Sequence, residues 1–211
     1  MARAGRPRSF DRDAAVELAM LLFWERGYER TSLDELRHAI GGGKAMSSAS
    51  FYAAFGSKEA LYREALARYL DLHGGMVGML RDAGQAPRAR LERALRASIA
   101  VQGDASHPLG CMLTLSAPIC PEEGEGVQPL AAAGRGVTRA ALRDCLVAGV
   151  EAGALLPDAD LEGLVALFDG FLLGVSIQVR DGVPLAAIEA AVGCAMGAWD
   201  VHSVRDKGVA D

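Results

Sequence analysis

The first sixty positions of this 211-residue chain are divided into very short segments by residues that begin or end helices. No other feature of the sequence limits the possible folds as strongly. Apolar residues of Ala14 to Trp24 recur at the i, i+3, i+4, i+7 spacing of an amphipathic helix, and Gly27 lies just beyond its end. Ser32 and Glu35 then have the spacing of a capping box, which predicts the start of a second helix.

The second helix is short because three consecutive glycines, Gly41-Gly42-Gly43, follow it. Ser47 or Ser48 can cap a third helix, predicted over Ser50 to Phe55. After Gly56 and Ser57 a longer helix is predicted from Lys58 to about Leu72. Segments this short are stable only when they pack against one another.

The third helix has two unlike sides. Phe51 and Phe55 can pack inward and anchor it, which leaves small residues outward, namely Ser48, Ala49, Ala53 and Ala54. A narrow helix of this kind fits a DNA major groove about 12 Å wide. Three short helices followed by a longer one describe a helix-turn-helix unit.

The rest of the chain is also predicted to be helical. No segment alternates as a half-buried strand does, and no repeat of fixed period occurs. The expected helices are Pro87 to about Gln102, Cys111 to Ala117, Gly136 to Gly153, Leu161 to Val179 and Pro184 to Trp199. On the first of these, a stripe is expected on the solvent side, formed by Arg88, Arg90, Arg93 and Arg96. The fold class is therefore all-α.

Charge is divided unequally along the chain, although the net charge is −5. Residues 1–68 carry 11 Lys and Arg against 9 Asp and Glu, or +2, whereas residues 69–211 carry 11 against 18, or −7. A basic end on an acidic body is typical of a small nucleic-acid-binding unit attached to a second functional unit. The basic excess is small, so the motifs have to support this interpretation.

Several other classes of site are not favoured. Gly41-Gly42-Gly43-Lys44 is no phosphate-binding loop, since His38 and Ala45 occupy the positions of the required glycine and hydroxyl residue. Four cysteines, with no short paired spacing, favour reduced thiols over disulfides or zinc; Cys111, Cys145 and Cys194 are expected as small buried residues, and Cys120 as a thiol to test for redox sensitivity. No catalytic residue, metal or cofactor is expected.

The order Phe23-x3-Gly27-Tyr28-x2-Thr31-Ser32, then Ser50-Phe51-Tyr52-x2-Phe55-x-Ser57-Lys58-Glu59-x-Leu61, resembles the N-terminal domain of the tetracycline-repressor (TetR/AcrR) family of transcriptional regulators. The resemblance covers about residues 10 to 69. It implies an N-terminal three-helix helix-turn-helix DNA-binding domain joined by a long helix to a C-terminal helical ligand-binding and dimerisation bundle.

The resemblance also implies roles for individual residues. Contacts with base edges would come from Ser48, Ala49, Ala53 and Ala54, through a hydroxyl or through methyl contact with thymine. Phosphates would be held by Ser32, Ser50, Tyr52 and Lys58. A small-molecule effector would change the spacing of two such helices in a homodimer through the long fourth helix, and so lower the affinity for a pseudo-palindromic operator.

The chain departs from the family pattern in one turn, and it also has a basic arm before the first helix. About four extra residues, Gly42 to Ala45, lengthen the turn before the third helix; Met46 is expected as its apolar plug, and Lys44 either as an added phosphate contact or as a solvated loop lysine. Before the first helix, Arg6 and Arg8 with Arg3 form a basic arm that either contacts DNA or is a solubilising tail.

In the C-terminal part, the helices Leu161 to Val179 and Pro184 to Trp199 are rich in small residues, which suits a dimer interface as well as an internal core. Weak candidates for the effector pocket, for which core packing is the stronger alternative, are Met76, Met79, Met112, Phe168 and Phe171. The apolar segment within the first of these helices is interrupted by Asp169 and Gln178, so no membrane span is expected.

The sequence thus predicts a basic arm over 1–9, a DNA-binding domain over 10–56, an effector-binding and dimerisation domain over 57–203, and a frayed tail over 204–211. The predicted function is a cytoplasmic, effector-responsive repressor that binds double-stranded DNA, not an enzyme. The alternative is an all-helical ligand-binding or enzymatic bundle without DNA binding.

Overall fold

The computed structural model describes residues 11–42, 44–116 and 127–204. All regular secondary structure in these parts is helical, apart from one isolated bridge between Leu155 and Ser203. The first four helices are α1 (Arg12–Arg26), α2 (Leu33–Ile40), α3 (Ser48–Phe55) and α4 (Lys58–His73). They are followed by α5 (Gly75–Leu80), α6 (Pro87–Gln102), α7 (Met112–Leu115), α8 (Gln128–Glu151), α9 (Leu161–Arg180) and α10 (Leu185–Val201).

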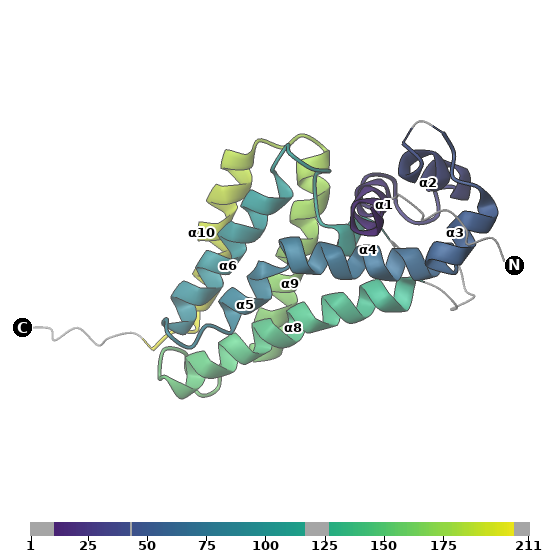
Figure 1. The fold of residues 1–211 in the computed structure, drawn as a ribbon. Coiled ribbons are helices and arrows are strands. Elements are labelled where there is room, and N and C mark those ends of the chain that lie inside the picture. Colours follow the sequence, from purple (N-terminus) through teal and green to yellow (C-terminus); the bar gives the residue numbers. More distant parts are fainter. Residues whose placement is uncertain (1–10, 43, 117–126, 205–211) are drawn as a thin grey trace, which may run out of the picture.

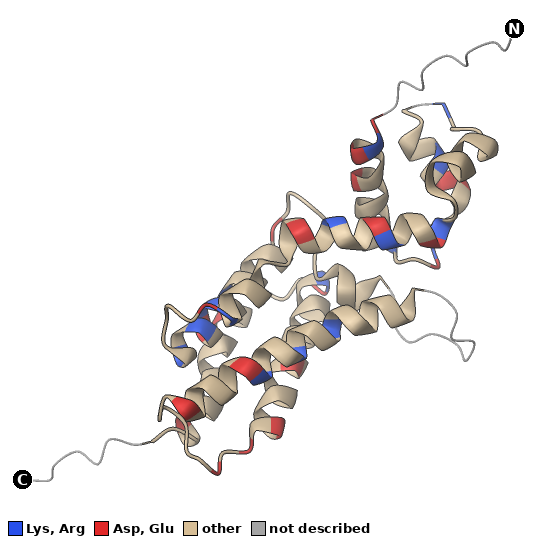
Figure 2. Cartoon of the chain, turned by 60° about the horizontal axis from the view of Figure 1, so that its bottom comes forward, with Lys and Arg blue, Asp and Glu red and all other residues tan. Residues whose placement is uncertain are grey.

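The helices form two regions joined by α4. In Figure 1, α1, α2 and α3 lie at one end, α6, α9 and α10 lie at the other, and α4 extends from the first region toward the second, with α8 alongside. We call α1–α3 the head and α5, α6 and α8–α10 the bundle. In Figure 2, acidic and basic residues lie close to one another along α4.

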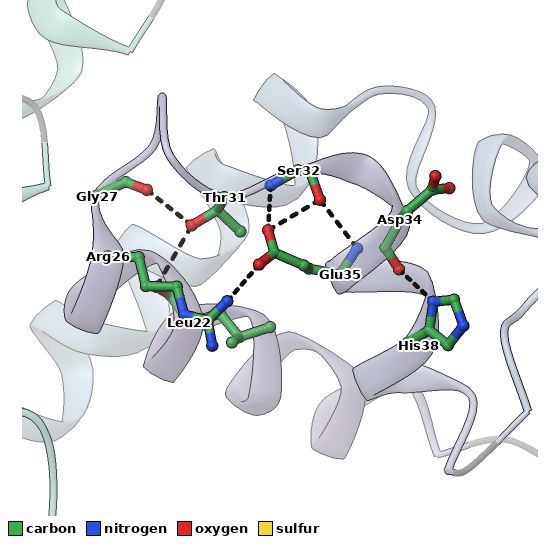
Figure 3. Close-up of polar contacts among 8 residues, drawn as sticks. All are labelled: Leu22, Arg26, Gly27, Thr31, Ser32, Asp34, Glu35 and His38. Atoms are coloured by element: carbon green, nitrogen blue, oxygen red, sulfur yellow. Dashed lines mark hydrogen bonds and ion pairs between the residues drawn. The ribbon is translucent and has the colours of Figure 1, made fainter.

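Local sequence signals begin and end the helices of the head. The Asp11 carboxylate accepts hydrogen bonds from the N–H groups of Asp13 and Ala14 at the start of α1, and Gly27, at φ 82°, ends that helix. The predicted capping box is confirmed: Ser32 Oγ accepts from the Glu35 N–H, and the Glu35 carboxylate accepts from the Ser32 N–H at 2.7 Å (Figure 3).

Several predicted boundaries differ from the structure, and two of the differences have a clear physical reason. The third helix begins at Ser48, two residues earlier than expected, because Ser47 caps it. The eighth begins at Gln128 instead of Gly136 and runs through Gly134. A Cβ at Gly134 would lie 2.6 Å from Leu113 Cδ2, so this glycine makes room for close packing and does not break the helix.

The hydrophobic core has two clusters. One, which we call the core of the head, combines the inner faces of α1–α3 and of the adjoining α4 with Met112, Leu113, Val127 and Ala131. The other joins the bundle helices around fully buried residues such as Phe168, Leu95 and Leu146. The segment around α7 thus belongs to the core of the head, although it lies some fifty residues later in the sequence.

The basic stripe expected on α6 is only partly correct. Arg88, Arg93 and Arg96 form ion pairs with Asp200, Asp82 and Glu92 at or near the surface. Arg90, in contrast, is buried, with 7% of its surface exposed. The physical reason is that α6 packs against α5, α8, α9 and α10, which leaves it a narrow solvent face.

By length and composition alone, α9 is the one helix within the described residues that could cross a membrane, and 44% of its apolar window is buried inside the structure. It packs against α8, α10 and α6. Its buried face carries the polar residues Asp169 and Ser176, both of which have hydrogen-bonding partners. The helix is therefore a core helix of the bundle.

A cluster of aromatic rings and imidazoles lies where α4 ends. The imidazole of His107 stacks on Trp24 with ring centroids 4.4 Å apart, and His73 contacts both. Burial lowers the pKa of His73 below its ordinary value of 6.5, and the neighbouring His107 lowers it further.

This lowered pKa predicts a loss of stability in mild acid. As the pH falls below about 6.5, the unfolded chain binds a proton at His73 before the folded chain does, so the free energy of unfolding decreases until the lower, folded-state pKa is passed. Calorimetry between pH 7.5 and 5 should show a falling Tm, and His73→Gln should reduce the slope. An unchanged slope in that variant would contradict the assignment to His73.

Candidate nucleic-acid interface

Helix α3 is anchored by the two phenylalanines predicted from the sequence. Phe51 is fully buried and Phe55 is 4% exposed, with their ring centroids 5.3 Å apart. The opposite side is open: Ser48, Ala49, Tyr52 and Ala53 are all exposed, Tyr52 by 51%. The serine and alanine side chains on this side are small enough to let the backbone of a helix approach the base edges of a duplex closely.

One residue of the predicted outer face lies elsewhere. Ala54 is half-buried and packs against the core of the head, so its methyl group is less available for base contact than those of Ala49 and Ala53. Its position next to Phe55 places it at the edge of the packed face, because successive helical residues are rotated by 100°.

The serines at the start of α3 are partly engaged. Ser47 Oγ accepts from the Ser50 N–H at 3.1 Å and donates to Ser50 Oγ at 2.9 Å. Ser50 is half-buried but keeps its own hydroxyl proton, which is not used by the Ser47 contact. Ser48 is the more exposed hydroxyl of the two.

Two hydrogen bonds that were not predicted from the sequence close the long turn between α2 and α3. Arg37 Nε donates to the carbonyl of Met46 at 2.6 Å, and the Met46 N–H donates to the carbonyl of Arg37 at 2.9 Å. A Cβ at Gly41 would lie 2.0 Å from the carbonyl oxygen of Lys44, and Gly42 has φ 60°. Only glycines permit this closure.

The two residues of this turn for which the sequence predicted a role, Met46 and Lys44, lie in different surroundings. Met46 packs against the core of the head, as the apolar plug was predicted to do. Lys44 is exposed, beside the start of α3. The signal that could have identified Arg37 is its place in the last turn of α2, where a long cationic side chain can reach nearby carbonyls.

Lys58 occupies the first position of α4. Its ammonium lies 4.1 Å from the centre of the Tyr28 ring, and the group is partly desolvated, which lowers its pKa. Glu29 and Glu35 oppose this shift. The ring therefore holds the cation near the N-terminus of α4, a position where free N–H groups and a positive charge together favour phosphate.

Ser32, the other predicted phosphate contact, is exposed but already serves the capping box. Its hydroxyl donates to Glu35 at 2.8 Å, and Glu35 is also paired with Arg26. These bonds hold the pKa of Glu35 below its usual value. The carboxylate covers part of the N-terminus of α2, so a phosphate contact there requires the Ser32 hydroxyl to turn outward.

Ion pairs connect α1 to α4 on the outside of the head. Arg12 pairs with Glu64 at 2.7 Å and lies 5.5 Å from the centre of the Phe55 ring; Arg68 pairs with Glu17 at 3.3 Å. These positions were not predicted from the sequence. The predicted contacts Arg6 and Arg8, with the rest of the basic arm, lie outside the described residues.

A cavity of about 250 Å³ lies between α4, α5, α6 and α8. Its wall is mainly apolar, and its polar groups include Tyr69, Ser98, Gln102 and Thr138. An adjoining void of about 50 Å³ shares part of this lining. A wider hollow of about 630 Å³ beside the α1–α2 loop is rimmed by charged residues such as Arg26, Glu29 and Arg30, which suits solvent better than an apolar ligand.

The predicted pocket residues are divided by the structure. Met76 and Met79 line the cavity. Met112, Phe168 and Phe171 do not: Met112 is buried in the core of the head, Phe168 is fully buried in the bundle, and Phe171 packs against the bundle core. The sequence could not separate them, because the side chains that line a cavity and those that fill a core have the same chemistry.

The thiols are also only partly as predicted. Cys145 is buried, and burial raises its pKa. Cys111 is half-buried and lines the cavity, whereas Cys194 is exposed on α10, which contradicts the expected burial. Cys120 lies outside the described residues. In the described ranges no three His, Cys, Asp or Glu side chains gather as metal ligands.

The outer faces of α9 and α10 carry exposed apolar side chains and glycines. Leu167 and Ile177 are 45% and 51% exposed, and a Cβ built at Gly170, Gly193 or Gly197 would meet no atom within 4 Å. These glycines are therefore not explained by packing within one chain. Small residues of this kind let a second helix approach closely.

Known proteins resemble the chain both in sequence and in structure. The family description "Bacterial regulatory proteins, tetR family" matches residues 15–65. The HTH-type transcriptional repressor ComR of Escherichia coli K12 is 29% identical over 197 residues, covering 92% of this chain and 91% of that protein. A second repressor of that organism, BdcR, is 34% identical over 79 residues, 37% of this chain and 38% of its own.

Among solved structures, the TetR family transcriptional regulator CifR, as a cysteine mutant complexed with 26-bp double-strand operator DNA, is 39% identical with a TM-score of 0.84. The match covers 92% of this chain and 100% of that one. A TetR regulator from Chloroflexus aurantiacus, 18% identical with a TM-score of 0.76 over 91% and 95% of the two chains, shares the fold.

Proposed function

Since the chain belongs to the TetR family of bacterial regulatory proteins, we propose that it is a transcriptional repressor that binds a DNA operator as a homodimer and leaves it when a small molecule binds. The observation that carries this proposal is α3, with Phe51 and Phe55 buried and its small residues exposed. The CifR structure with operator DNA supports it, because the match extends over the whole of that chain.

The exposed face of α3 reads the bases in this proposal. Ser48, Ala49 and Ala53 contact base edges, with Ala54 at the margin. Tyr52, Lys58, Ser50 and Ser32 position the head on phosphates, together with Lys44 in the long turn and Arg6 and Arg8 in the arm. Lys58 and Tyr52 are the strongest members of this group, because one has a charge beside a helix N-terminus and the other a hydroxyl on an exposed, rigid ring.

A homodimer is required because one short helix reads too few bases. Two copies related by a two-fold axis place two such helices about one turn of DNA apart and read a pseudo-palindrome. We place the interface on the outer faces of α9 and α10, where Leu167, Ile177 and the open glycines lie. The mutual burial of these faces extends the bundle core into a second chain.

The cavity beside α4 is the proposed effector site. Its volume of about 250 Å³ suits a small, mainly apolar molecule. Met76 and Met79 supply adaptable contacts, whereas Met112, Phe168 and Phe171 contribute to packing only. The cavity extends along Tyr69 to His73 of α4, the helix that leads to the head.

We assign residues 10–56 to DNA binding, 57–203 to effector binding and dimerisation, 1–9 to the arm and 204–211 to the tail. The packing of Met112, Leu113, Val127 and Ala131 within the core of the head adds a contribution of the second domain to the first. The protein acts in the cytoplasm, where the DNA is, and is not an enzyme. A helical bundle without DNA contact is the alternative, which leaves the open face of α3 unexplained.

The experiment is a gel-shift titration on the DNA upstream of the gene. We expect Lys58→Ala to weaken binding about tenfold and to reduce the salt slope by about 1, since one phosphate contact is lost. Tyr52→Phe, which removes one hydroxyl, should weaken binding by a smaller factor.

The matched control is Arg96→Ala, which removes one positive charge from α6 in the bundle. It should leave both the affinity and the salt slope unchanged. Equal losses in Lys58→Ala and Arg96→Ala would show that net charge alone matters and would refute the proposed contact. Wild-type protein that binds no DNA at low salt would refute the function.

A further inference from the structure

One short segment, Leu109–Ser116, contacts both the head and the cavity; we call it the strap. On the side of the head, the indole N–H of Trp24 donates to the carbonyl of Gly110 at 3.0 Å. The N–H of Tyr28 donates to the carbonyl of Ser116 at 2.9 Å, and the Ser116 hydroxyl is bonded to the hydroxyl of Tyr62 on α4. Both ends of the strap are therefore fixed to the head, and its Ser116 end is also fixed to α4.

The middle of the strap forms part of the cavity wall. Cys111 and Leu113 line the cavity of about 250 Å³, while Met112, between them, is fully buried in the core of the head. The hydroxyl of Tyr69, on α4, donates to Cys111 Sγ at 3.3 Å. A ligand that displaces Cys111 or Leu113 must therefore also move backbone that packs against the head.

Arg180, the last residue of α9, holds the strap and α1 together. Its guanidinium donates to three backbone carbonyls: Leu109 at 3.0 Å, Glu25 at 2.9 Å and Trp24 at 2.8 Å. Two of these belong to the last turn of α1, where carbonyls lack helical partners and a cation is favoured. One side chain thus links the proposed dimer helix, the strap and the head.

Gly110 limits how the strap can move. Its φ is 80°, and a Cβ there would lie 2.5 Å from Leu115 Cδ1 and 3.0 Å from the carbonyl oxygen of Ser176 on α9. Close packing of this kind favours discrete rearrangements over gradual deformation.

We infer that the strap couples occupancy of the cavity to the position of α1, with Trp24 and Arg180 as its positioning residues. This inference rests on the proposed function. It adds a second route from the cavity to the head, besides the route through α4 itself. The strap is joined to α1 by the buried hydrogen bond from Trp24, and Trp24 packs edge-on against Tyr69 of α4 with ring centroids 4.8 Å apart, so the strap is tied to two helices that share one core. Movement of the strap therefore shifts α1 together with the part of α4 that packs against it, and alters the presentation of α3.

The test uses a cavity-filling variant in place of an effector. Thr138→Phe adds a ring at a position that lines both the cavity and the adjoining void. In the otherwise wild-type chain it should weaken operator binding at least tenfold. Trp24→Phe removes the N–H donor and keeps an aromatic ring. When Thr138→Phe is combined with Trp24→Phe or with Arg180→Gln, it should weaken operator binding less than threefold.

Trp24→Phe and Arg180→Gln alone should bind the operator within about threefold of wild type, which separates coupling from a purely structural role. The matched control is Trp199→Phe, the same chemical change in the bundle core, where Trp199 is 1% exposed. In the Trp199→Phe background, Thr138→Phe should weaken operator binding as much as it does in the otherwise wild-type chain. If Thr138→Phe fails to fold by circular dichroism, Ala97→Leu, another lining position, takes its place.

Hydrogen exchange supplies a readout that needs no DNA. Cavity filling should change the exchange of α1 amides in the wild-type background and not in Trp24→Phe. Equal effects of filling in both backgrounds, or no effect in either, would overturn the inference. If the protein binds no operator but the exchange pattern appears, the proposed function fails and the strap coupling stands.

Discussion

Replacing Phe51 by alanine is expected to cost about 3–5 kcal/mol of stability, because the side chain is fully buried and its removal leaves a cavity under α3. In a chain of this size such a loss lowers Tm by about 10 °C. The head should lose its ordered third helix first, and operator binding should be abolished at temperatures where the bundle is still folded. Thermal unfolding followed by circular dichroism, together with gel shifts, measures both effects.

The neighbouring aromatic residue is the control. Tyr52 is half exposed, so Tyr52→Ala should change stability by no more than about 0.5 kcal/mol while still weakening DNA binding. If Tyr52→Ala destabilised the chain as much as Phe51→Ala, α3 would not present the face that the proposed function requires.

Replacing Ile177 by glutamate is expected to convert the dimer into monomers. The side chain is 51% exposed on α9, so the single chain should tolerate the charge. In the proposed interface, the same carboxylate would be buried without a partner, at a cost of several kcal/mol. Sedimentation should show a halved mass, and operator affinity should fall more than about a hundredfold, since each monomer reads one half-site.

Val147→Glu is the matched substitution on another surface, since Val147 is 37% exposed on α8. It should leave both the mass and the operator affinity unchanged. Monomers in both variants, or dimers in both, would place the interface elsewhere than on α9 and α10.

The head was largely predictable because its signals are local. The capping box of Ser32 and Glu35, the glycine after α1 and the two phenylalanines of α3 all act within a few residues of one another, and each is confirmed. A helix boundary was wrong where a glycine serves packing with a distant residue, as Gly134 does for Leu113.

The proposed pocket could not be predicted to the same extent. By sequence alone, Met76 and Phe168 are equally suited to line an apolar pocket. In the structure, Met76 lines the cavity and Phe168 is fully buried in the core. Arg90 and Cys194 show the same limit: their burial depends on which neighbouring helices cover α6 and α10, which periodicity within one helix does not specify.

The sequence by itself determined the helical class, the order of the helices in the head and the two-sided character of α3, because caps, breaks and apolar spacing are written in neighbouring residues. Only the tertiary structure decided that residues near 110 pack within the core of the head, that Arg180 reaches the end of α1, and which side chains surround the cavity. Such contacts join residues 71 to 156 positions apart, and they depend on how whole helices pack, which no local pattern specifies.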